Sequence, residues 1–294
     1  MKDSKQIVFE DLTVVIILYK SSNLVLKLID EIKTINILIV DNGGNKNILK
    51  DILKRNKNTK IISPKKNLGF GGGVNFAIHH INTKFFIILN PDLLINEDNI
   101  RKLLYTILTN KNCAIAAPIT KPDKDFYGIF PENGKGIVRN EIEQNTANML
   151  ENKLIEGLFC TDVVKGCAML INTKVFKDIG MFNEKYFLFW EEVDLCRRIR
   201  SKNLSIIICH DSQAKHIEGS SSRMDLKTFF IRAYHNELSP FFYYKVKKLS
   251  FNLTWKMLKY LFRSFTYLAT FNIKNSIKNI AKFLAILNYI FRLN

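Results

Sequence analysis

Several features that mark other protein classes are missing from this sequence of 294 residues. Its five cysteines form no CxxC pair and show no metal-ligand spacing, which excludes a disulfide framework or a zinc site and predicts reduced, mostly buried thiols. The opening stretch, MKDSKQIVFEDL, lacks the apolar run of a signal peptide. No charge-free apolar stretch approaches the roughly 18–20 residues that span a bilayer. We therefore expect a cytoplasmic protein that does not cross a membrane.

A complete dinucleotide-binding fingerprint is also missing, although residues 67–75 read NLGFGGGVN and hold four of the 13 glycines. Counted from Gly69 and Gly71, the third glycine of GxGxxG would fall on Val74. The segment also follows the third expected strand, whereas the fingerprint follows the first. A nicotinamide-dependent oxidoreductase is therefore disfavoured. Two interpretations stay open: a loop over another phosphorylated ligand, or a tight strand-to-helix turn.

The first 120 residues alternate short apolar runs with segments of helical periodicity, which predicts βαβ units and a mostly parallel central sheet flanked by helices. The expected strands lie at 12–19, 35–43, 59–64 and 84–92, and the expected helices at 21–33, 45–55 and 74–81. Asp41, Asn67 and Asp92 follow three of these strands. Ligands of such sheets bind beyond the carboxyl ends of the strands, so we expect these side chains to face one crevice.

Regular periodicity weakens over residues 118–162, which we interpret as an inserted or variable region. It returns at 163–171, 173–180, 190–202 and 204–210. Taken singly, the motifs here and upstream have ordinary explanations. DNG at 41–43 and NPD at 90–92 are common turns, and His216 also fits a polar loop. The acidic residues of 190–202 also fit a solvated helical face paired with nearby arginines.

Together, VVIILYK, ILIVDNGG, NLGFGGGVNFAI, LNPDLLI, the block from Val164 to Asn203 and HIEGSSSR resemble the family 2 glycosyltransferases. The likeness is to the bacterial rhamnosyltransferase-like branch that builds surface polysaccharides such as O-antigen, and it covers roughly residues 10–223. It implies a GT-A fold, transfer with inversion, a nucleotide-diphosphate sugar donor, and Mg²⁺ or Mn²⁺ as cofactor.

The resemblance also assigns the donor and metal residues. Asp92 matches the last Asp of the family's DxD motif and His216 its later histidine ligand, while the neutral Asn90 stands where the motif begins with Asp. Hard divalent cations prefer oxygen ligands, so this change weakens the expected metal site. Asp41 matches the acidic residue that contacts the nucleoside. The other residues that the resemblance places at the donor are Tyr19, Asn67, Gly69, Asn75, Lys165 and Gly166.

An inverting transfer needs one base to take the proton of the attacking acceptor hydroxyl. The resemblance implies an E-D-x-D pattern whose first Asp is the base, and here it reads Glu191-Glu192-Val193-Asp194, with Glu192 in the place of that Asp. Glu192 is therefore the predicted base, with Asp194 as the reserve candidate or an arginine-paired structural residue. Trp190 and Glu191 are predicted to contact the acceptor, with core packing as the alternative for Trp190.

The C-terminal residues differ in kind from the rest. Residues 227–294 carry 12 Lys or Arg against one acidic residue, Glu237, and hold 17 of the 34 aromatic residues. We divide the chain into a GT-A domain at 1–223 and a helical segment at 224–294. The composition favours helices on an anionic membrane surface. The alternatives are packing on the core or in a homodimer, and nucleic-acid binding, for which no motif is present.

The sequence thus predicts an inverting glycosyltransferase, peripheral on the inner face of the cell membrane, that transfers rhamnose from dTDP-rhamnose to a saccharide or polyprenyl-linked acceptor. Two alternatives remain. One is a transferase that uses UDP-galactose or UDP-GlcNAc. The other is a donor-binding scaffold that lost catalysis through Asn90 and Glu192.

Overall fold

The structure is a computed structural model and describes residues 8–121, 158–217, 222, 224–245 and 251–292. Most of the predicted inserted region and most of the HIEGSSSR motif lie outside the described residues. The chain divides into two compact units. The first comprises 1–183 and 192–222, and the second comprises 184–191 and 223–294. The predicted domain boundary at 223 stays a prediction, and the segment 184–191 is an addition that the sequence did not suggest.

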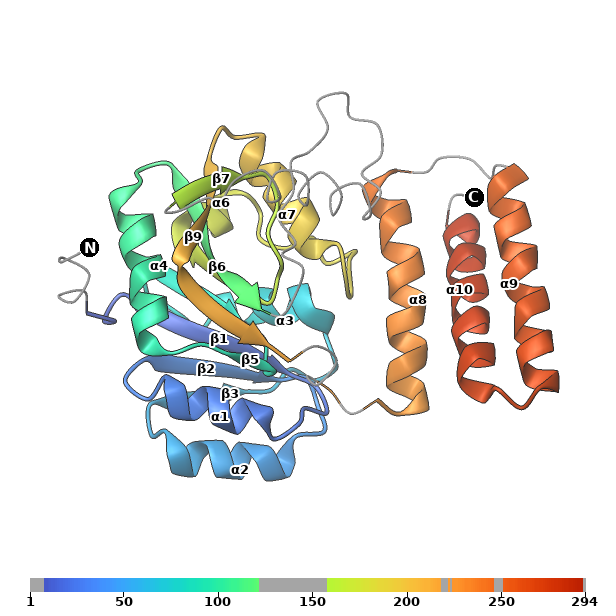
Figure 1. Cartoon of the computed structure of the whole chain (residues 1–294), viewed down its shortest axis with the longest axis horizontal. Coiled ribbons are helices and arrows are strands. Elements are labelled where there is room, and N and C mark those ends of the chain that lie inside the picture. The colour runs from blue at the N-terminus through green and yellow to red at the C-terminus, as the bar shows by residue number, and fades with distance from the viewer. Residues whose placement is uncertain (1–7, 122–157, 218–221, 223, 246–250, 293–294) are drawn as a thin grey trace. The chain divides into compact units, whose positions relative to one another are not determined.

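A nine-stranded sheet forms the centre of the first unit (Figure 1). Its order is β3-β2-β1-β4-β8-β6-β9-β5, with β7 beside β9. The strands are β1 (Leu12–Leu18), β2 (Asn36–Asp41), β3 (Thr59–Ile62), β4 (Phe85–Leu89), β5 (Leu93–Leu94), β6 (Cys113–Lys121), β7 (Leu158–Thr161), β8 (Ala168–Asn172) and β9 (Ser205–His216). The first four in chain order are mutually parallel, which confirms the α/β class. β8 runs antiparallel to both its neighbours, so the whole sheet is mixed.

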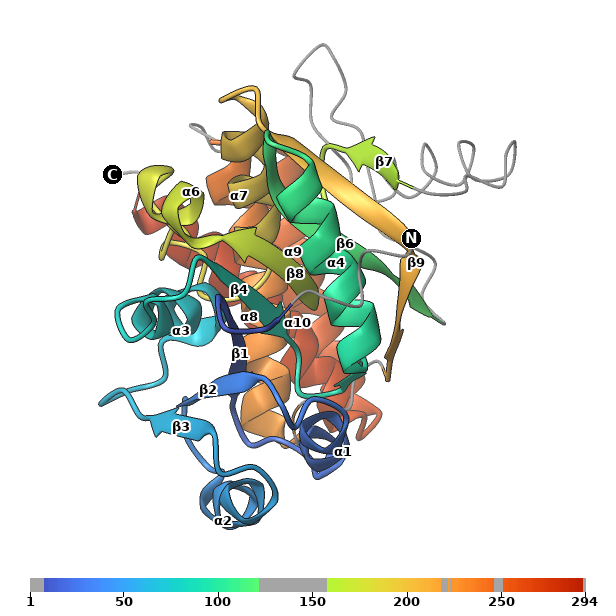
Figure 2. The same cartoon turned by 90° about the vertical axis from the view of Figure 1, so that its left-hand side faces the viewer.

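Helices cover both faces of this sheet (Figure 2). They are α1 (Leu24–Glu31), α2 (Lys46–Arg55), α3 (Gly69–Ile78), α4 (Glu97–Thr109), α6 (Thr173–Asp178) and α7 (Glu191–Arg200). Side chains alternate along a strand, so Val14 and Ile16 pack into the core shared with α1, α2 and α4. Phe86 points to the opposite face, where its ring meets Phe176 of α6 at 5.1 Å. Every residue of β1 is buried, as its continuous β-branched run predicts.

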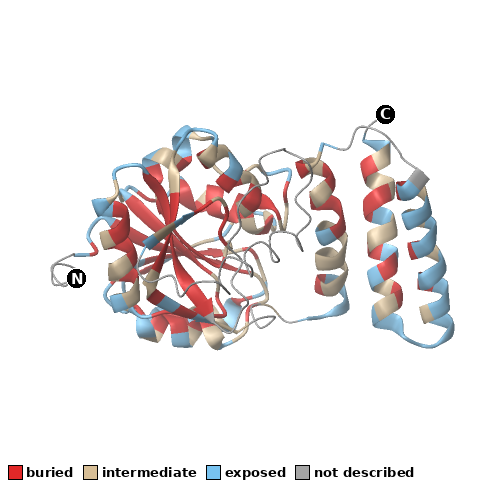
Figure 3. Cartoon of the chain, turned by 45° about the horizontal axis from the view of Figure 1, so that its top comes forward, coloured by how far each residue is buried: buried red, intermediate tan, exposed pale blue. Residues whose placement is uncertain are grey.

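The second unit is a helical bundle of α8 (Leu226–Tyr243), α9 (Phe251–Ala269) and α10 (Ile273–Phe291), in which α10 packs on both of the others. Apolar side chains from each helix meet in its core, including Leu238, Tyr260 and Ile286. Figure 3 shows how burial is distributed over these helices. None of the helices in the described part of the chain is both long and apolar enough to span a membrane.

Candidate functional site

Asp41 is the last residue of β2 and shapes the turn that follows. Its Oδ1 accepts hydrogen bonds from the amide of Gly43 at 2.9 Å and from Asn45 Nδ2 at 2.5 Å. Asn45 Oδ1 accepts a bond from the amide of Ser21, just beyond β1, at 2.8 Å. Gly43 has a φ of +122°, a backbone region that favours glycine. The ends of two adjacent strands are thus joined, and Asp41 is held half-buried at the carboxyl edge of the sheet.

From Gly69 on the glycine segment is helical and not a loop, whereas its contact with the donor stays a prediction. α3 begins at Gly69, and residues 71–73 lie inside it. A Cβ at Gly73 would lie 3.1 Å from Ile17 Cγ2 on β1 and 3.3 Å from Asn42 Nδ2. The absent side chain therefore lets α3 approach the sheet closely. The alternative of a tight strand-to-helix turn fits better, since Gly69 has a φ of +76° and its amide donates to Asn67 Oδ1 at 2.9 Å.

Asn42 is a buried residue that the sequence analysis missed. Its Nδ2 donates to the carbonyl oxygen of Gly69 at 2.8 Å, and its Oδ1 accepts from the amide of Leu68 at 3.3 Å. It therefore ties the start of α3 to the end of β2. The sequence signal was present, because Asn42 directly follows Asp41, but a DNG triplet predicts a turn without showing what the asparagine side chain contacts.

Asp92 and His216 are brought together by the pairing of β5 with β9, in which Leu93 lies opposite His216. His216 Nε2 is 3.4 Å from Asp92 Oδ1. Asp92 is 1% exposed, and among the described residues its Oδ1 has no hydrogen-bond partner. The preceding turn is fixed by Asn90, whose amide donates to the carbonyl oxygen of Cys167 at 2.9 Å. A buried carboxylate beside an imidazole suits a cation, although no third His, Cys, Asp or Glu of the described residues completes a cluster with them.

Glu192 lies at the start of α7, against the segment that contains Gly166. A Cβ built on Gly166 would lie 3.5 Å both from Glu192 Cβ and from Phe70 Cε1. Gly166 therefore brings together the predicted base and the first turn of α3. Glu192 is partly exposed, whereas its neighbour Glu191 is buried at 4% exposure. Of the two carboxylates, Glu192 is the more accessible to an acceptor, and burial disfavours the predicted acceptor contact of Glu191.

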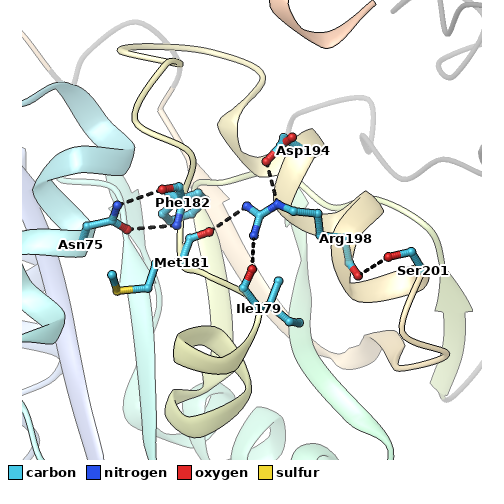
Figure 4. A network of polar contacts seen from close by, with 7 residues as sticks. All are labelled: Asn75, Ile179, Met181, Phe182, Asp194, Arg198 and Ser201. Carbon is cyan, nitrogen blue, oxygen red and sulfur yellow. Dashed lines mark hydrogen bonds and ion pairs between the residues drawn. The ribbon is translucent and has the colours of Figure 1, made fainter.

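Asp194 takes part in a structural network with Arg198 (Figure 4). Arg198 Nε lies 2.9 Å from Asp194 Oδ2, and its terminal nitrogens donate to the carbonyl oxygens of Ile179 at 2.9 Å and Met181 at 2.7 Å. The arrangement matches the arginine-paired alternative for Asp194 and leaves Glu192 as the candidate base. Arg198 itself was treated in the sequence as a surface charge, but here it holds the turn after α6.

Asn75 fixes the same turn from α3. Its carboxamide is buried, with Nδ2 donating to the carbonyl oxygen of Phe182 at 2.9 Å and Oδ1 accepting from the amide of Phe182 at 3.0 Å. Asn75 thus has a structural function that the predicted donor contact did not include. The remaining predicted donor residues, Tyr19 and Lys165, are half-buried directly after β1 and directly before Gly166.

The segment before α7 has an unusual backbone and belongs to the second unit. Phe189 and Trp190 have φ values of +67° and +72°, a region that costs an L-residue about 1–2 kcal/mol. Trp190 is 9% exposed, and the centre of its ring lies 5.1 Å from that of the Tyr243 ring and 5.5 Å from that of the Tyr244 ring. These contacts favour the core-packing alternative for Trp190 over stacking on an acceptor sugar.

Further contacts from α8 hold this segment. Ser239 Oγ donates to the carbonyl oxygen of Leu188 at 2.9 Å, and the ring of Phe187 stacks on His235 at 4.6 Å. A strained turn persists when its surroundings fix it. The chain then passes from the second unit to the first between Glu191 and Glu192.

All five cysteines are free, and four of them are buried, as the sequence predicts. Burial raises the pKa of Cys113 and of Cys196 to about 12. Cys196 lies one turn of α7 beyond Glu192 and stays a neutral thiol at physiological pH, so it is not a nucleophile for this site.

Residues 13–180 match the family model described as "Glycosyl transferase family 2". The chain belongs to glycosyl transferase family 2. This confirms the family that the sequence motifs predicted. The predicted rhamnosyltransferase-like branch and the predicted nucleotide-sugar-dependent glycosyltransferase activity are confirmed as well.

Two relatives and one solved structure illustrate the similarity of this family 2 chain to known proteins. The low-salt glycan biosynthesis hexosyltransferase Agl10 of Haloferax volcanii is 28% identical over 225 residues, which cover 72% of this chain and 69% of that protein. The N-acetylglucosaminyl-diphospho-decaprenol L-rhamnosyltransferase of Mycobacterium tuberculosis is 21% identical over 217 residues, 66% of this chain and 70% of that protein. The mannosyltransferase PcManGT of Pyrobaculum calidifontis, solved with GDP-Man and Mn²⁺, has a TM-score of 0.55 at 14% identity, over 80% of this chain and 67% of that chain. This last likeness shows the GT-A-like fold.

Proposed function

We propose that this glycosyltransferase transfers rhamnose from dTDP-rhamnose, with inversion, to a saccharide or polyprenyl-linked acceptor in bacterial surface polysaccharide synthesis. The observation that carries the proposal is the buried Asp92 carboxylate, 3.4 Å from His216 at the carboxyl edge of the sheet. The sugar and the lipid-linked acceptor are supported by the name of the mycobacterial relative, a rhamnosyltransferase named for a diphospho-decaprenol compound.

The donor nucleotide would lie along the edge formed by β1, β2 and the start of α3. Asp41 has one carboxylate oxygen engaged in its own turn and is half-buried, which suits hydrogen bonding to the ribose or base. Asn42 and Asn67 hold the start of α3 in place beside it. These residues bind and orient the donor.

Asp92 and His216 would hold Mg²⁺ or Mn²⁺, and the buried, hydrogen-bond-deficient Oδ1 of Asp92 fits such a ligand. When bound, the cation neutralises the charge that grows on the leaving diphosphate. The solved mannosyltransferase of the same fold contains Mn²⁺, which supports this assignment. Asn90 lacks the charge of the usual first aspartate, so we expect weaker metal affinity than a DxD site provides.

Glu192 is the proposed base. The acceptor hydroxyl oxygen forms a bond to the anomeric carbon as the bond from that carbon to the diphosphate oxygen breaks on the opposite side. The hydroxyl proton passes to the Glu192 carboxylate. Its partly exposed position beside Gly166 and Phe70 supports this function. General-base assistance of this kind contributes on the order of 10²–10⁴ in rate.

The test is nucleoside diphosphate release from a panel of dTDP- and UDP-sugars, with Mn²⁺, Mg²⁺ or EDTA, in the presence of membrane extract as a source of acceptor. We expect release from dTDP-rhamnose that EDTA abolishes. Glu192→Gln should lower kcat by about 10²–10⁴-fold and leave nucleotide affinity unchanged, whereas Asp92→Asn should weaken activation by Mn²⁺.

Glu31→Gln, an exposed carboxylate at the end of α1, is the matched control and should behave like the wild type. Release from a UDP-sugar alone would replace the donor assignment. Nucleotide binding without release from any donor would favour the scaffold, and full activity of Glu192→Gln would remove the assigned base.

A further inference from the structure

α9 carries apolar side chains on two opposite faces. On one face, Leu253 and Tyr260 are buried in the bundle core against α10. On the other face, large apolar side chains are 49–70% exposed and recur at intervals of three and four residues. This row, the α9 stripe, consists of Trp255, Leu258, Phe262 and Phe265. Its spacing places the four side chains on one side of the helix. Figure 3 shows α9 largely in the colour of exposed residues.

Exposed basic residues lie on α9 beside the stripe, and others lie on α10. Lys259 and Arg263 are exposed and lie one turn apart on the same flank, and Lys274 and Lys278 are exposed on α10. Residues 251–294 contain no Asp or Glu at all. A partner for this surface must therefore accept aromatic rings and supply negative charge.

We propose that the α9 stripe binds the surface of an anionic lipid membrane, with α9 lying in the interface. Trp and Phe rings insert at the level of the lipid headgroups, while Lys259 and Arg263 lie against lipid phosphates. A second copy of this chain fits less well, because two α9 helices packed through this face would bring their basic flanks together without acidic partners. The inference goes beyond the proposed function, and its test requires no sugar transfer.

Tryptophan fluorescence tests the surface directly, because the chain has two tryptophans and they differ in exposure. Trp255 is 64% exposed and Trp190 is 9% exposed. On titrating the full chain with phosphatidylglycerol-containing vesicles we expect a blue shift of the emission, and no shift with pure phosphatidylcholine vesicles. Trp255→Phe should abolish the shift but retain sedimentation with the vesicles, because phenylalanine keeps the apolar contact.

Three variants separate the contribution of the α9 stripe to vesicle binding from that of the basic residues and from that of exposed apolar side chains elsewhere. Trp255→Ser/Phe262→Ser/Phe265→Ser should lower the partition coefficient for anionic vesicles at least ten-fold, and Lys259→Glu/Arg263→Glu should do so more strongly at low salt than at high salt. Leu53→Ser/Leu108→Ser removes apolar side chains of similar exposure from the first unit and should leave the partition unchanged. Circular dichroism checks that each variant keeps its helix content.

Unchanged vesicle binding by the triple serine variant would overturn the proposal, and so would a wild type that does not bind anionic vesicles. Sedimentation velocity identifies the competing occupant. If the wild type is a dimer that the serine variant converts to a monomer, with no affinity for vesicles, the stripe is an interface between two copies.

Discussion

In the first unit the apolar side chains of the strands are buried against the helices on both faces of the sheet. In the second unit apolar side chains lie both in the core of the bundle and on its outer surface. Twelve of the sixteen large apolar side chains that are exposed in the described residues belong to the second unit. Polar residues of the first unit gather instead at the carboxyl edge of the sheet, among them Asp41, Asp92 and His216. The two units thus differ in what they expose: the first unit groups polar side chains at one edge of its sheet, and the second unit presents large apolar side chains on the surface of its helices.

The largest effect on stability is expected at Glu237, the one acidic residue of 227–294. It is 7% exposed, and its carboxylate lies 2.6 Å from Lys256 Nζ and 3.6 Å from Lys282 Nζ and accepts a hydrogen bond from the Tyr260 hydroxyl at 3.0 Å. Burial, and then Glu237, raise the pKa of Tyr260. Glu237→Gln keeps an acceptor for Tyr260 but removes the charge, and should cost the bundle about 2–3 kcal/mol in urea unfolding.

The matched control for Glu237 is the exposed pair of Lys174 and Asp178, whose Nζ and Oδ2 are also 2.6 Å apart. Asp178→Asn should change stability by less than about 0.5 kcal/mol. Equal losses of stability in the two variants would show that the buried carboxylate of Glu237 contributes no more than an exposed carboxylate does.

A smaller effect, on the first unit, is expected from Gly73→Ala. The new methyl group would meet Ile17 and Asn42, so the variant should lose about 1–3 kcal/mol of stability. Gly72→Ala is the control, because its Cβ would meet only Leu68 Cβ, at 3.2 Å. There the better helix propensity of alanine, worth up to about 1 kcal/mol, offsets the contact. Thermal unfolding of the two variants measures the difference, and a neutral Gly73→Ala would remove the close-packing explanation of Gly73.

The smallest effect is a pH dependence of the second unit through His235. Burial, and then the charge of Arg292, lower the pKa of His235 to about 4, against about 6.5 in the unfolded chain. Between these values the unfolded state binds a proton that the folded state does not. Stability is therefore full above pH 6.5 and falls as the pH drops toward 4, by about 1–2 kcal/mol.

His235→Phe keeps a ring to stack on Phe187 and should flatten this part of the pH profile, followed by circular dichroism in urea at pH 7.5 and 4.5. His79→Phe, an exposed histidine at the end of α3, is the control and should leave the profile as it is. An unchanged slope in His235→Phe would assign the acid sensitivity to other groups.

The sequence predicted the regular elements well where one local pattern dominates. The run at 12–19 forms β1 at Leu12–Leu18, and the segment at 45–55 forms α2 at Lys46–Arg55. Glycine has a poor helix propensity, so the sequence did not predict that α3 begins at Gly69. At Gly73 the absence of a side chain is explained by Ile17 on β1, which no local pattern reveals.

For the candidate site, the sequence offered residues but not their arrangement in space. The family resemblance named Asp92 and His216, but their proximity depends on the pairing of β5 with β9, which no local pattern reveals. Asn42 was missed, and Arg198 was expected only to pair with acidic residues of its own helix, because the backbone atoms that they bind lie in distant segments. Trp190 and Glu191 were assigned to the acceptor, yet their burial depends on tertiary packing that a linear sequence does not display.

The left-handed turn at Phe189 and Trp190 has a consequence for protein engineering. Its aromatic and hydrogen-bond contacts are with α8. The eight residues from Glu184 to Glu191 therefore belong structurally to the C-terminal bundle, although in the sequence they lie between segments of the first unit. A chimera that exchanges the C-terminal helices of two such transferases at residue 223 would combine 184–191 of one parent with α8 of the other. Exchanging 184–191 together with 223–294 as one cassette keeps the turn and its supporting rings from the same parent.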